Sequence, residues 1–335
     1  MRRLPDRMLI ALAAVTIFAC VIACSRTADK AAGPAEKATI AYSAPPYSVL
    51  VDIAQKQGYF LQAGLETTPL TYPYGKLALD ALLEGKADFA TAGETPVMFA
   101  IMKGRKISII ATIQTSNLNN AVIARRHKGI LAPRDLKGMR IAVTFGTVGE
   151  FFLDAFLAVN GVSRGDVRMI NMGPDEMQEA LASGSVDAVS SWSPVTLSLQ
   201  KKLGDKVITF HNEDVYTQSF NVVATQEYVR KNPVKVKKLL LAIIEAEKFA
   251  ARSPEDAKKI IADISPLNRD LVGEMWDRNK FSVTLDQSLV LALEDESRWA
   301  ITSRLTKETN VPNYLDFIYL DGLLSVKPEA VRILR

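Results

Sequence analysis

The sequence predicts an α/β protein with two similar lobes, each a parallel sheet covered by helices on both faces. Two stretches, 81–97 and 180–195, share a helix end, a glycine, a short strand led by Asp, and a Pro suited to the first turn of another helix. The likeness extends upstream, since 39–43 resembles 140–144. The chain of 335 residues also has room for two domains of ordinary size. Two such lobes leave a cleft between them, where we expect the functional site.

The N-terminus is predicted to be a lipoprotein signal peptide that covers 1–23. Three arginines precede an apolar run of 16 residues, which is shorter than the ~20 residues of a membrane span. The run ends in Val21-Ile22-Ala23-Cys24, which resembles the bacterial lipobox. That resemblance implies cleavage before Cys24 and attachment of lipid to it, so that the protein is held on a membrane. An uncleaved anchor and a plain secretory signal are the alternatives.

The mature chain is predicted to be close to neutral and to have no free thiol. Removing 1–23 takes away three of the 41 basic and one of the 37 acidic residues, which leaves a net charge of +2. No basic stretch is interleaved with aromatic residues, so nucleic-acid binding is not expected. Cys20 is removed and Cys24 is lipidated, which excludes a disulfide, a cysteine nucleophile and a cysteine metal site. Residues 24–37 are small and polar, and they predict a flexible tether.

From residue 38 strands alternate with helices, and this order predicts a parallel sheet with helices on both of its faces. Gly58 and Gly161 follow the first helix of each copy, at the position where helices commonly end in left-handed backbone. The first copy has predicted strands at 39–42, 65–70, 88–91 and 107–114, and helices at 47–57, 76–83 and 96–103. The second copy has predicted strands at 139–144, 167–172, 187–191 and 207–210, and helices at 148–160, 175–183 and 195–203.

Two short β-like runs, 121–125 and 219–225, are predicted to cross between the lobes. Hinges are expected near 120–122 and 220–222. From residue 226 the pattern is helical, with apolar residues at helical spacing over 236–246. These helices are expected to pack on the lobes. The resulting assignment is 38–121 and 220–335 for lobe 1 with its C-terminal helices, and 122–219 for lobe 2.

Five stretches together resemble one family of proteins: 57–60 with 64–65, 93–96, 135–143, 184–188 and 192–194. They are similar to the solute-binding proteins of ABC importers, of the nitrate/sulfonate/taurine type that includes relatives of thiamine-precursor binders. The resemblance implies a periplasmic-binding-protein-like fold of type II, with two doubly wound α/β lobes joined by two hinge strands. It also implies a small organic solute, an ABC permease with its ATPase as partners, and a location in the cell envelope facing the periplasm or the cell exterior.

The chain departs from that family's pattern at one position and lacks one feature. Ser193 stands where many members have an acidic residue, which weakens a taurine-like assignment because an acid could hold an amine. No arginine lies in the turns expected at the cleft, so a strongly held dianion is not favoured. A cleft with aromatic residues and one acid but no arginine indicates a modest organic molecule more than a bare inorganic anion.

The loop 145–149 is the first candidate for the ligand site, since ligands of open α/β sheets bind at the carboxyl ends of strands. Gly146 allows close backbone approach, and Thr147 precedes a helix whose first N–H groups suit an anion or an oxygen-rich group. The alternative for Thr147 is an ordinary N-cap. Glu94 is expected at the cleft entrance as an acceptor for a cationic or N–H-bearing solute. Its alternative is a carboxylate stabilised by a helix dipole.

Aromatic and polar residues complete the expected site. Trp192 is expected to form an apolar wall, the alternative being a core tryptophan. Tyr72 and Tyr74 follow a predicted strand and can stack on an organic solute. The remaining candidates are polar residues at strand ends, helix starts or hinges, whose alternative is to satisfy local backbone: Ser43, Thr95, Thr115, Asn117 and Gln218.

The sequence holds no pattern typical of an enzyme, a metal site or a cofactor. His127 lies in a charged loop, and His211 has no second histidine near it. Zinc-ligand spacing, a Gly-x-Ser-x-Gly turn and a phosphate-binding Gly-rich loop with Lys are all lacking. We therefore expect no catalytic residues, no metal and no cofactor. The alternatives are a sensor or scaffold lipoprotein of the same fold and a carboxylate-dependent enzyme.

Overall fold

The computed structural model describes residues 35–44, 46–211, 213–214 and 216–334. The expected signal peptide, Cys24 and nearly all of the expected tether therefore lie outside the described residues. Glu36–Arg335 form one compact unit. Within the part of the chain that the structure describes, no helix is both long enough and apolar enough to span a membrane.

Lobe 1 is built on a seven-stranded sheet in the order β12-β11-β4-β10-β3-β1-β2. β1 pairs in parallel with β2 and β3, whereas β10 runs antiparallel to both β3 and β4. The carboxyl ends of β1, β2, β3 and β4 therefore meet at one edge of the sheet. The strands are β1 (Glu36–Ser43), β2 (Leu65–Tyr72), β3 (Phe89–Gly93), β4 (Ile107–Ser116), β10 (Gln218–Thr225), β11 (Lys280–Asp286) and β12 (Val331–Arg332). Its first helices are α2 (Val49–Lys56), α3 (Tyr59–Gln62), α4 (Gly75–Leu83) and α5 (Glu94–Met102).

Lobe 2 repeats this arrangement on a five-stranded sheet in the order β7-β6-β8-β5-β9. The order β7-β6-β8-β5-β9 corresponds position by position to β2-β1-β3-β10-β4 of lobe 1. In both lobes the fourth strand of this order, β5 or β10, is antiparallel to its two neighbours. The repeat in the sequence thus corresponds to a repeat in topology. The strands are β5 (Asn120–Arg125), β6 (Arg140–Val143), β7 (Arg168–Asn171), β8 (Ala188–Trp192) and β9 (Val207–Phe210). The helices are α6 (Val148–Val159), α7 (Pro174–Ser183) and α8 (Val195–Leu203).

Helices cover both faces of the lobe 2 sheet because its central strands are apolar on both faces. Along β5, Ala121 and Ile123 join one buried cluster, whereas Val122 and Ala124 join another. This alternation follows from the two-residue period of a strand. The first cluster includes Leu181 of α7, and the second contains residues of α6. The expected doubly wound architecture is therefore present.

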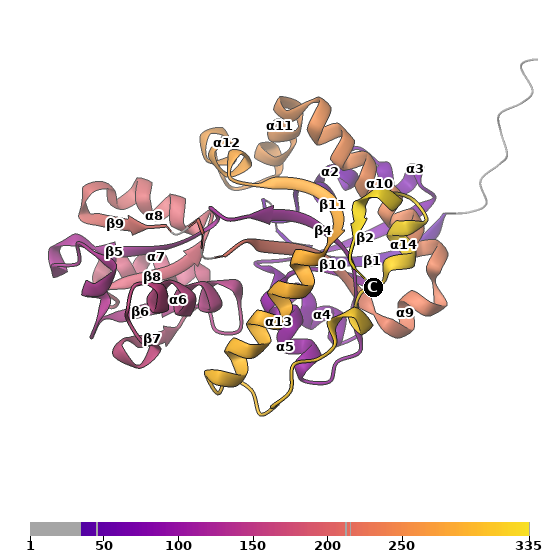
Figure 1. Ribbon diagram of the computed structural model, residues 1–335. Coiled ribbons are helices and arrows are strands. Elements are labelled where there is room, and N and C mark those ends of the chain that lie inside the picture. The colour runs from indigo at the N-terminus through magenta and orange to yellow at the C-terminus, as the bar shows by residue number, and fades with distance from the viewer. Residues whose placement is uncertain (1–34, 45, 212, 215, 335) are drawn as a thin grey trace, which may run out of the picture. The chain divides into compact units, whose positions relative to one another are not determined.

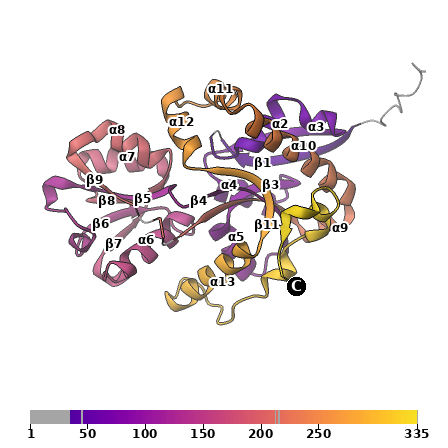
Figure 2. The ribbon, with the colours of Figure 1, turned by 45° about the horizontal axis from the view of Figure 1, so that its top comes forward.

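The chain after β10 forms a helical extension of lobe 1, and we use this name for residues 226–334. The expected apolar face of α10 is confirmed, since Val236, Leu239, Leu240, Ile243 and Ala246 are all buried. α10 packs on α2 and α3, and α13 packs on α5. In Figures 1 and 2, α12 lies beside α8 of lobe 2 and α13 lies beside α6. The helices are α9 (Gln226–Lys231), α10 (Pro233–Arg252), α11 (Pro254–Ile264), α12 (Arg269–Asp277), α13 (Gln287–Thr302) and α14 (Leu320–Leu324).

Two details differ from the prediction. The runs expected to cross between the lobes are full members of the sheets: β5 pairs with β8 and β9, and β10 pairs with β3 and β4. Pairing satisfies their backbone groups on both edges. The chain crosses between the lobes just before each of them, between β4 and β5 and between β9 and β10. The second difference is β11, which interrupts the region predicted as helical. Phe281, Val283 and Leu285 alternate with polar residues there, which is a strand period.

Candidate ligand-binding site

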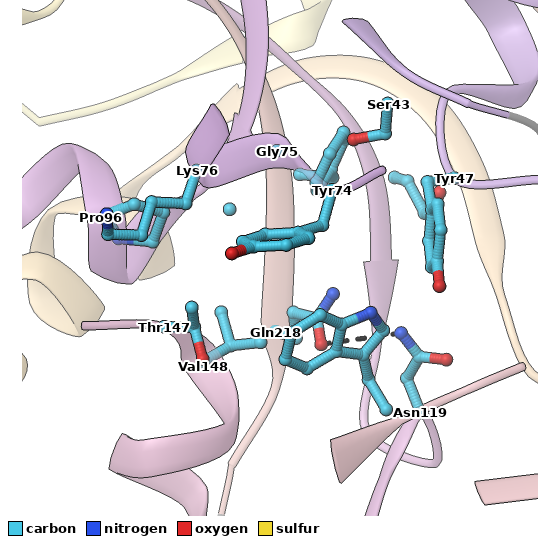
Figure 3. A pocket seen from close by; sticks show the side chains of 14 residues that line it. Ser43, Tyr47, Tyr74, Gly75, Lys76, Pro96, Asn119, Thr147, Val148 and Gln218 are labelled. Atoms are coloured by element: carbon cyan, nitrogen blue, oxygen red, sulfur yellow. Dashed lines mark hydrogen bonds between the residues drawn. The ribbon is translucent and has the colours of Figure 1, made fainter. Parts of the chain in front are cut away.

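A cavity lies between the lobes at the carboxyl ends of the lobe 1 strands, and residues of both lobes line it (Figure 3). Lobe 1 contributes residues from the ends of β1 and β3, the start of α4, β4 and β10. Lobe 2 contributes the start of α6 and the end of β8. The lining consists of Ser43, Tyr47, Tyr74, Gly75, Lys76, Gly93, Pro96, Gln114, Asn119, Thr147, Val148, Trp192, Gln218 and Phe220. We call this the inner cavity.

Two aromatic rings, one from each lobe, meet in the inner cavity. The ring centroids of Tyr74 and Trp192 are 6.3 Å apart, and the ring planes are inclined at 60°. Such an edge-to-face pair is favourable because a ring edge is positive and a ring face negative. Trp192 is also part of the buried cluster of lobe 2, so it is both a wall of the cavity and a core residue. Figure 3 shows the Tyr74 ring in the middle of the cavity, with Tyr47 on one side and Lys76 on the other.

The ends of helices make the inner cavity favourable for an anion. α4 of lobe 1 begins at Gly75, and α6 of lobe 2 begins at Val148, both in the cavity wall. The first N–H groups of a helix have no partner within it, and the helix dipole is positive there. Among the described residues, Lys76 is the one charged side chain in the lining, and its Nζ lies 3.4 Å from Asp80. None of the lining residues that the structure describes is acidic.

Three buried polar atoms in the wall have no hydrogen-bond partner among the described residues: Ser43 Oγ, Gln114 Oε1 and Asn119 Oδ1. Buried polar groups are nearly always hydrogen-bonded in folded proteins. Gln218 is oriented by its neighbours, because its Oε1 accepts hydrogen bonds from Asn119 Nδ2 at 3.4 Å and Asn120 Nδ2 at 2.9 Å. The three atoms are therefore polar groups of the cavity wall whose hydrogen-bonding capacity is unused among the described residues.

The structure places five of the expected ligand residues in the inner cavity: Ser43, Tyr74, Thr147, Trp192 and Gln218. The Thr147 hydroxyl donates to the Thr144 carbonyl at 2.6 Å and does not cap α6, so its N-cap alternative is wrong for the side chain. Gly146 lies outside this cavity, with φ at +70°. Its N–H donates to Glu150 Oε2 at 2.7 Å.

Three more expected residues lie elsewhere. Tyr72, at the end of the edge strand β2, packs against the core of lobe 1. Thr115 lines a different groove, beside α13. Asn117 lies in the crossing segment, where its Nδ2 donates to the Glu213 carbonyl at 3.3 Å. Their neighbours in sequence, Tyr74 and Asn119, are the residues that reach the cavity.

Glu94 does not face the cleft entrance, which corrects the expectation from the sequence. It is fully buried, and its Oε2 accepts hydrogen bonds from Ser219 N at 2.9 Å and Ser219 Oγ at 3.2 Å. Burial raises the pKa of Glu94 to about 8, although the hydrogen bonds from Ser219 lower it in part. The reason is local: β10 runs beside β3, so the first residue of α5 turns toward β10.

A second buried carboxyl group, that of Glu296 in α13, is the hydrogen-bond partner of the Thr95 side chain. Thr95 Oγ1 donates to Glu296 Oε1 at 2.9 Å, and the Tyr216 hydroxyl lies 3.3 Å from the same oxygen. Burial and the charge of Glu94 raise the pKa of Glu296. Among the described residues, neither carboxylate forms an ion pair with a Lys, Arg or His side chain. Thr95 and Glu94 therefore belong to a buried polar cluster beneath the crossing segment, not to the cavity wall.

Sequence reasoning missed several lining residues, although Val148 lies in the candidate loop 145–149. Lys76 is the clearest omission, because it lies at the start of a helix that follows a strand. The rule that ligands bind at the carboxyl ends of strands applies to this position and could have identified it. Tyr47, Gln114 and Phe220 gave no comparable signal, since the cavity reaches them only through the packing of distant strands.

Comparison with known proteins agrees with this architecture. Residues 46–257 match the family model described as NMT1/THI5 like. Binding proteins of several Brucella strains, among them Brucella abortus (strain 2308), are 30% identical over 213 residues, which are 63% of this chain and 65% of theirs. The chain therefore spans less than two thirds of the length of these relatives. The taurine-binding periplasmic protein of Escherichia coli (strain K12) is 27% identical over 243 residues, 69% of this chain and 72% of its own length.

The fold is also similar to that of solved structures. The alkanesulfonate-binding protein SsuA from Xanthomonas axonopodis pv. citri, bound to MOPS, superimposes with a TM-score of 0.75 and 22% identity, covering 86% of this chain and 99% of that one. The fold is thus that of a type II periplasmic binding protein, as the sequence predicted. Because the matching family model covers more than half of the chain, this protein belongs to the NMT1/THI5-like family.

Proposed function

We propose that this protein is the substrate-binding component of an ABC importer, not an enzyme, and that it captures a small organic anion in the inner cavity. One observation carries the proposal: the starts of α4 and α6, from opposite lobes, and Lys76 converge on a cavity with an aromatic pair. Helix starts and an ammonium group stabilise a negative charge, and aromatic rings supply contact area for an organic body. The relationship to a taurine-binding protein supports a sulfonate as the anionic group.

The anion is expected to lack an ammonium group, unlike taurine. Within the part of the chain that the structure describes, no acidic side chain lines the inner cavity, so an amine of the solute would find no carboxylate there. Ser193, where many relatives have an acid, is fully buried, and its hydroxyl lies 3.3 Å from that of Thr196. A simple alkanesulfonate should therefore bind more tightly than taurine.

Capture is proposed to occur by closure of the lobes around the solute. A ligand held by α4 and α6 touches both lobes only when they are together, which favours the closed state over the open one. Other contacts join the lobes at the flanks of the cleft: Leu197 of α8 is buried with Leu271 and Met275 of α12. The permease and its ATPase would receive the solute from the closed form. No covalent step is needed.

The test is a ligand panel on the purified full-length protein. Thermal unfolding is measured with methanesulfonate, ethanesulfonate, taurine, nitrate and a primary amine. A ligand at a hundred times its Kd stabilises the folded state by ~2.7 kcal/mol. We expect sulfonates without an amine to raise the melting temperature most. If none of the anions does so while an amine does, the proposed ligand class is wrong.

The protein is further proposed to be lipid-anchored through Cys24, outside the cytoplasm. The support is the lipobox-like sequence after an apolar run. Metabolic labelling with a radioactive fatty acid should label the native protein and not a Cys24→Ser variant. Equal labelling of both would place the lipid elsewhere, and labelling of neither would leave a plain secretory signal or an uncleaved anchor.

A further inference from the structure

The edge of the lobe 2 sheet that is opposite the cleft carries an excess of positive charge. β6, β7, β8 and β9 run in one direction and β5 runs against them, so the carboxyl end of β5 meets the amino ends of the other four. The cleft lies at the other edge, where β8 ends at Trp192. In Figures 1 and 2 the edge opposite the cleft points away from lobe 1. Residues 126–137, which follow β5, and 202–206, which precede β9, lie at this edge, and we call them the basic tip.

Cations outnumber carboxylates on the basic tip. Its exposed basic side chains are Arg126, Lys128, Arg134, Lys137, Lys202 and Lys206. Its acidic side chains are Asp135 and Asp205, so its net charge is +4, whereas the whole mature chain is expected to carry +2. The charges of the neighbouring residues Asp166 and Arg168 cancel each other. Positive charge is therefore concentrated at this end of lobe 2.

The two segments of the basic tip form one surface. Arg126 Nε donates to the carbonyl of Val207, the residue directly after the second segment, at 3.0 Å. Among the described residues, Lys137 is the one cation of the six that forms an ion pair, with Asp166 at 3.7 Å. Like charges gathered on one surface repel one another, so a partner with negative charge is favoured there.

An exposed leucine lies in the middle of the longer segment. Leu131 is 64% exposed, whereas its neighbour Ile130 is fully buried in the core of lobe 2. Asp135 Oδ2 accepts hydrogen bonds from the N–H of Leu131 at 2.9 Å and from the next N–H at 2.8 Å. The loop is thus held in a shape that presents Leu131 to solvent. Lys128 and Arg134 are each three residues away from it along the chain.

This combination of groups suits a lipid surface. Cations gain from contact with anionic headgroups, and an exposed apolar side chain gains from burial where headgroups and acyl chains meet. We propose that the basic tip docks on an anionic lipid membrane, with its cations among the headgroups and Leu131 inserted between them. A nucleic acid is a poorer match, because the tip contains no Phe, Tyr or Trp on which bases could stack.

The inference goes beyond the proposed function and holds whichever solute binds in the inner cavity. It assigns a membrane contact to lobe 2, whereas the expected lipid anchor at Cys24 precedes lobe 1 in the sequence. A single attachment leaves a protein free to rotate above the membrane. A second attachment restricts its orientation and so raises its effective concentration toward a partner in the same membrane.

The test places a polarity-sensitive dye on the basic tip of the full-length protein. Leu131→Cys is labelled with acrylodan and reconstituted with phosphatidylcholine vesicles, in which a third of the lipid either is or is not replaced by anionic phosphatidylglycerol. Unaltered protein treated in the same way gives the background from Cys20 and Cys24. We expect blue-shifted emission only with phosphatidylglycerol, and its loss at about 1 M salt, where the Debye length falls to about 3 Å. Val234→Cys, at a 56% exposed position of α10, is the control and should not shift.

Charge variants of the labelled protein show whether the cations are responsible. Lys128→Gln, Arg134→Gln and Lys206→Gln together should weaken association of the tip with the anionic vesicles about a hundredfold, at roughly fivefold for each charge. The matched control neutralises three exposed lysines of lobe 1 and its helical extension: Lys56→Gln, Lys259→Gln and Lys307→Gln. This control changes the net charge equally and should leave the emission shift unchanged.

Four results would overturn the proposal. The first is no emission shift of labelled Leu131→Cys with phosphatidylglycerol, and the second is an equal shift without it, which would reflect proximity to any bilayer. The third is an equal effect of the two triple variants, since net charge and not the tip would then be responsible. The fourth is tighter binding of a single-stranded oligonucleotide than of the anionic vesicles at the same salt, measured by anisotropy, which would make the tip a nucleic-acid surface. The proposed function stands in all four cases.

Discussion

Trp192 shows how one side chain serves both the fold and the site. It is 5% exposed, belongs to the buried cluster of lobe 2, and meets Tyr74 of lobe 1 in the inner cavity. Trp192 thus lines the cavity and is also a core residue, whereas its contact with a ligand stays a prediction. A strand that ends at the cleft places its last side chain between the core and the cavity.

Replacing Trp192 by Ala should weaken ligand binding at least tenfold. The variant loses an aromatic face in contact with the solute and the edge-to-face pair with Tyr74. Calorimetry with the tightest-binding alkanesulfonate gives the affinity. Trp276→Ala is the matched control, because Trp276 packs against Phe281 in the helical extension and does not line the inner cavity. Equal affinities of the Trp192 variant and the unaltered protein would remove Trp192 from the site.

Replacing Glu94 by Gln should flatten the dependence of stability on pH. The pKa of Glu94 is raised from 4.5 to about 8 by burial, so between these values the folded state holds a proton that the unfolded state has lost. The free energy of unfolding therefore falls as pH rises from about 4.5 to about 8, by up to roughly 1.4 kcal/mol per pH unit. Glu94→Gln has no proton to lose at this position.

Urea denaturation at pH 5, 6.5 and 8 measures the effect. The unaltered protein should lose stability toward pH 8, and Glu94→Gln should lose clearly less, with Glu296 providing the remainder. Glu66→Gln, at an exposed position of β2, is the control and should keep the original slope. An identical slope for Glu94→Gln would show that this carboxyl group is ionised in the folded protein at neutral pH.

At the scale of elements, the cleft depends on glycines where helices follow strands. A Cβ on Gly75 would lie 2.9 Å from both Ala92 Cα and Phe220 Cζ, and one on Gly93 would lie 3.0 Å from Val148 Cγ1. The first contact is within lobe 1, between the start of α4 and the neighbouring strands. The second is between the lobes. Small residues thus let the helix starts approach the sheet edge and each other.

Gly75→Ala should destabilise the protein by about 1–3 kcal/mol, because the neighbouring atom Ala92 Cα is backbone and cannot move aside easily. Gly273→Ala is the matched control. It lies inside α12 with no atom within 4 Å of the added Cβ, so it should stabilise the protein by about 0.5–1 kcal/mol. Chemical denaturation distinguishes the two. A neutral Gly75→Ala would mean that β3 and α4 are further apart in solution.

The elements themselves were largely predictable from the sequence, and the exceptions have physical reasons. The repeat and the alternation of strands with helices predicted both lobes, because each unit has local signals for its own ends. β10 and β5 were recognised as strands but not as sheet members, since pairing with distant strands leaves no local mark. Asn119 escaped attention for the same reason, since its position in the cavity depends on how the chain crosses between the lobes.

At the scale of the whole molecule, the lobes contact each other on both flanks of the cleft. On each flank the contact is made between the helical extension of lobe 1 and a helix of lobe 2. α12 meets α8 through Leu271 and Met275, which are buried with Leu197, and Lys201 lies 3.4 Å from Glu274. On the other flank Trp299 of α13 donates to Asp154 of α6 at 2.7 Å. An exposed ion pair such as Lys201–Glu274 contributes little to stability. The apolar contact of Leu197 with α12 is therefore the stronger link between the lobes on that flank.

Leu197→Ala should weaken ligand binding about tenfold with a smaller effect on unfolding of the lobes. Leu197 is 1% exposed because it is covered by the helical extension, so its burial accompanies closure. Calorimetry gives the affinity, and small-angle scattering with saturating ligand gives the radius of gyration. Val159→Ala, at a 61% exposed position of α6, is the control. Unchanged affinity in Leu197→Ala would mean that this contact persists in the open form.

The tryptophans have a practical consequence for following this motion. The chain has three: Trp192 meets Tyr74 across the cleft, Trp299 bonds to Asp154 across the other contact, and Trp276 packs on Phe281 within one lobe. In a Trp276→Phe variant every remaining indole sits at a junction between lobes. Its ultraviolet emission would then report opening and shutting directly, in real time and without any attached dye.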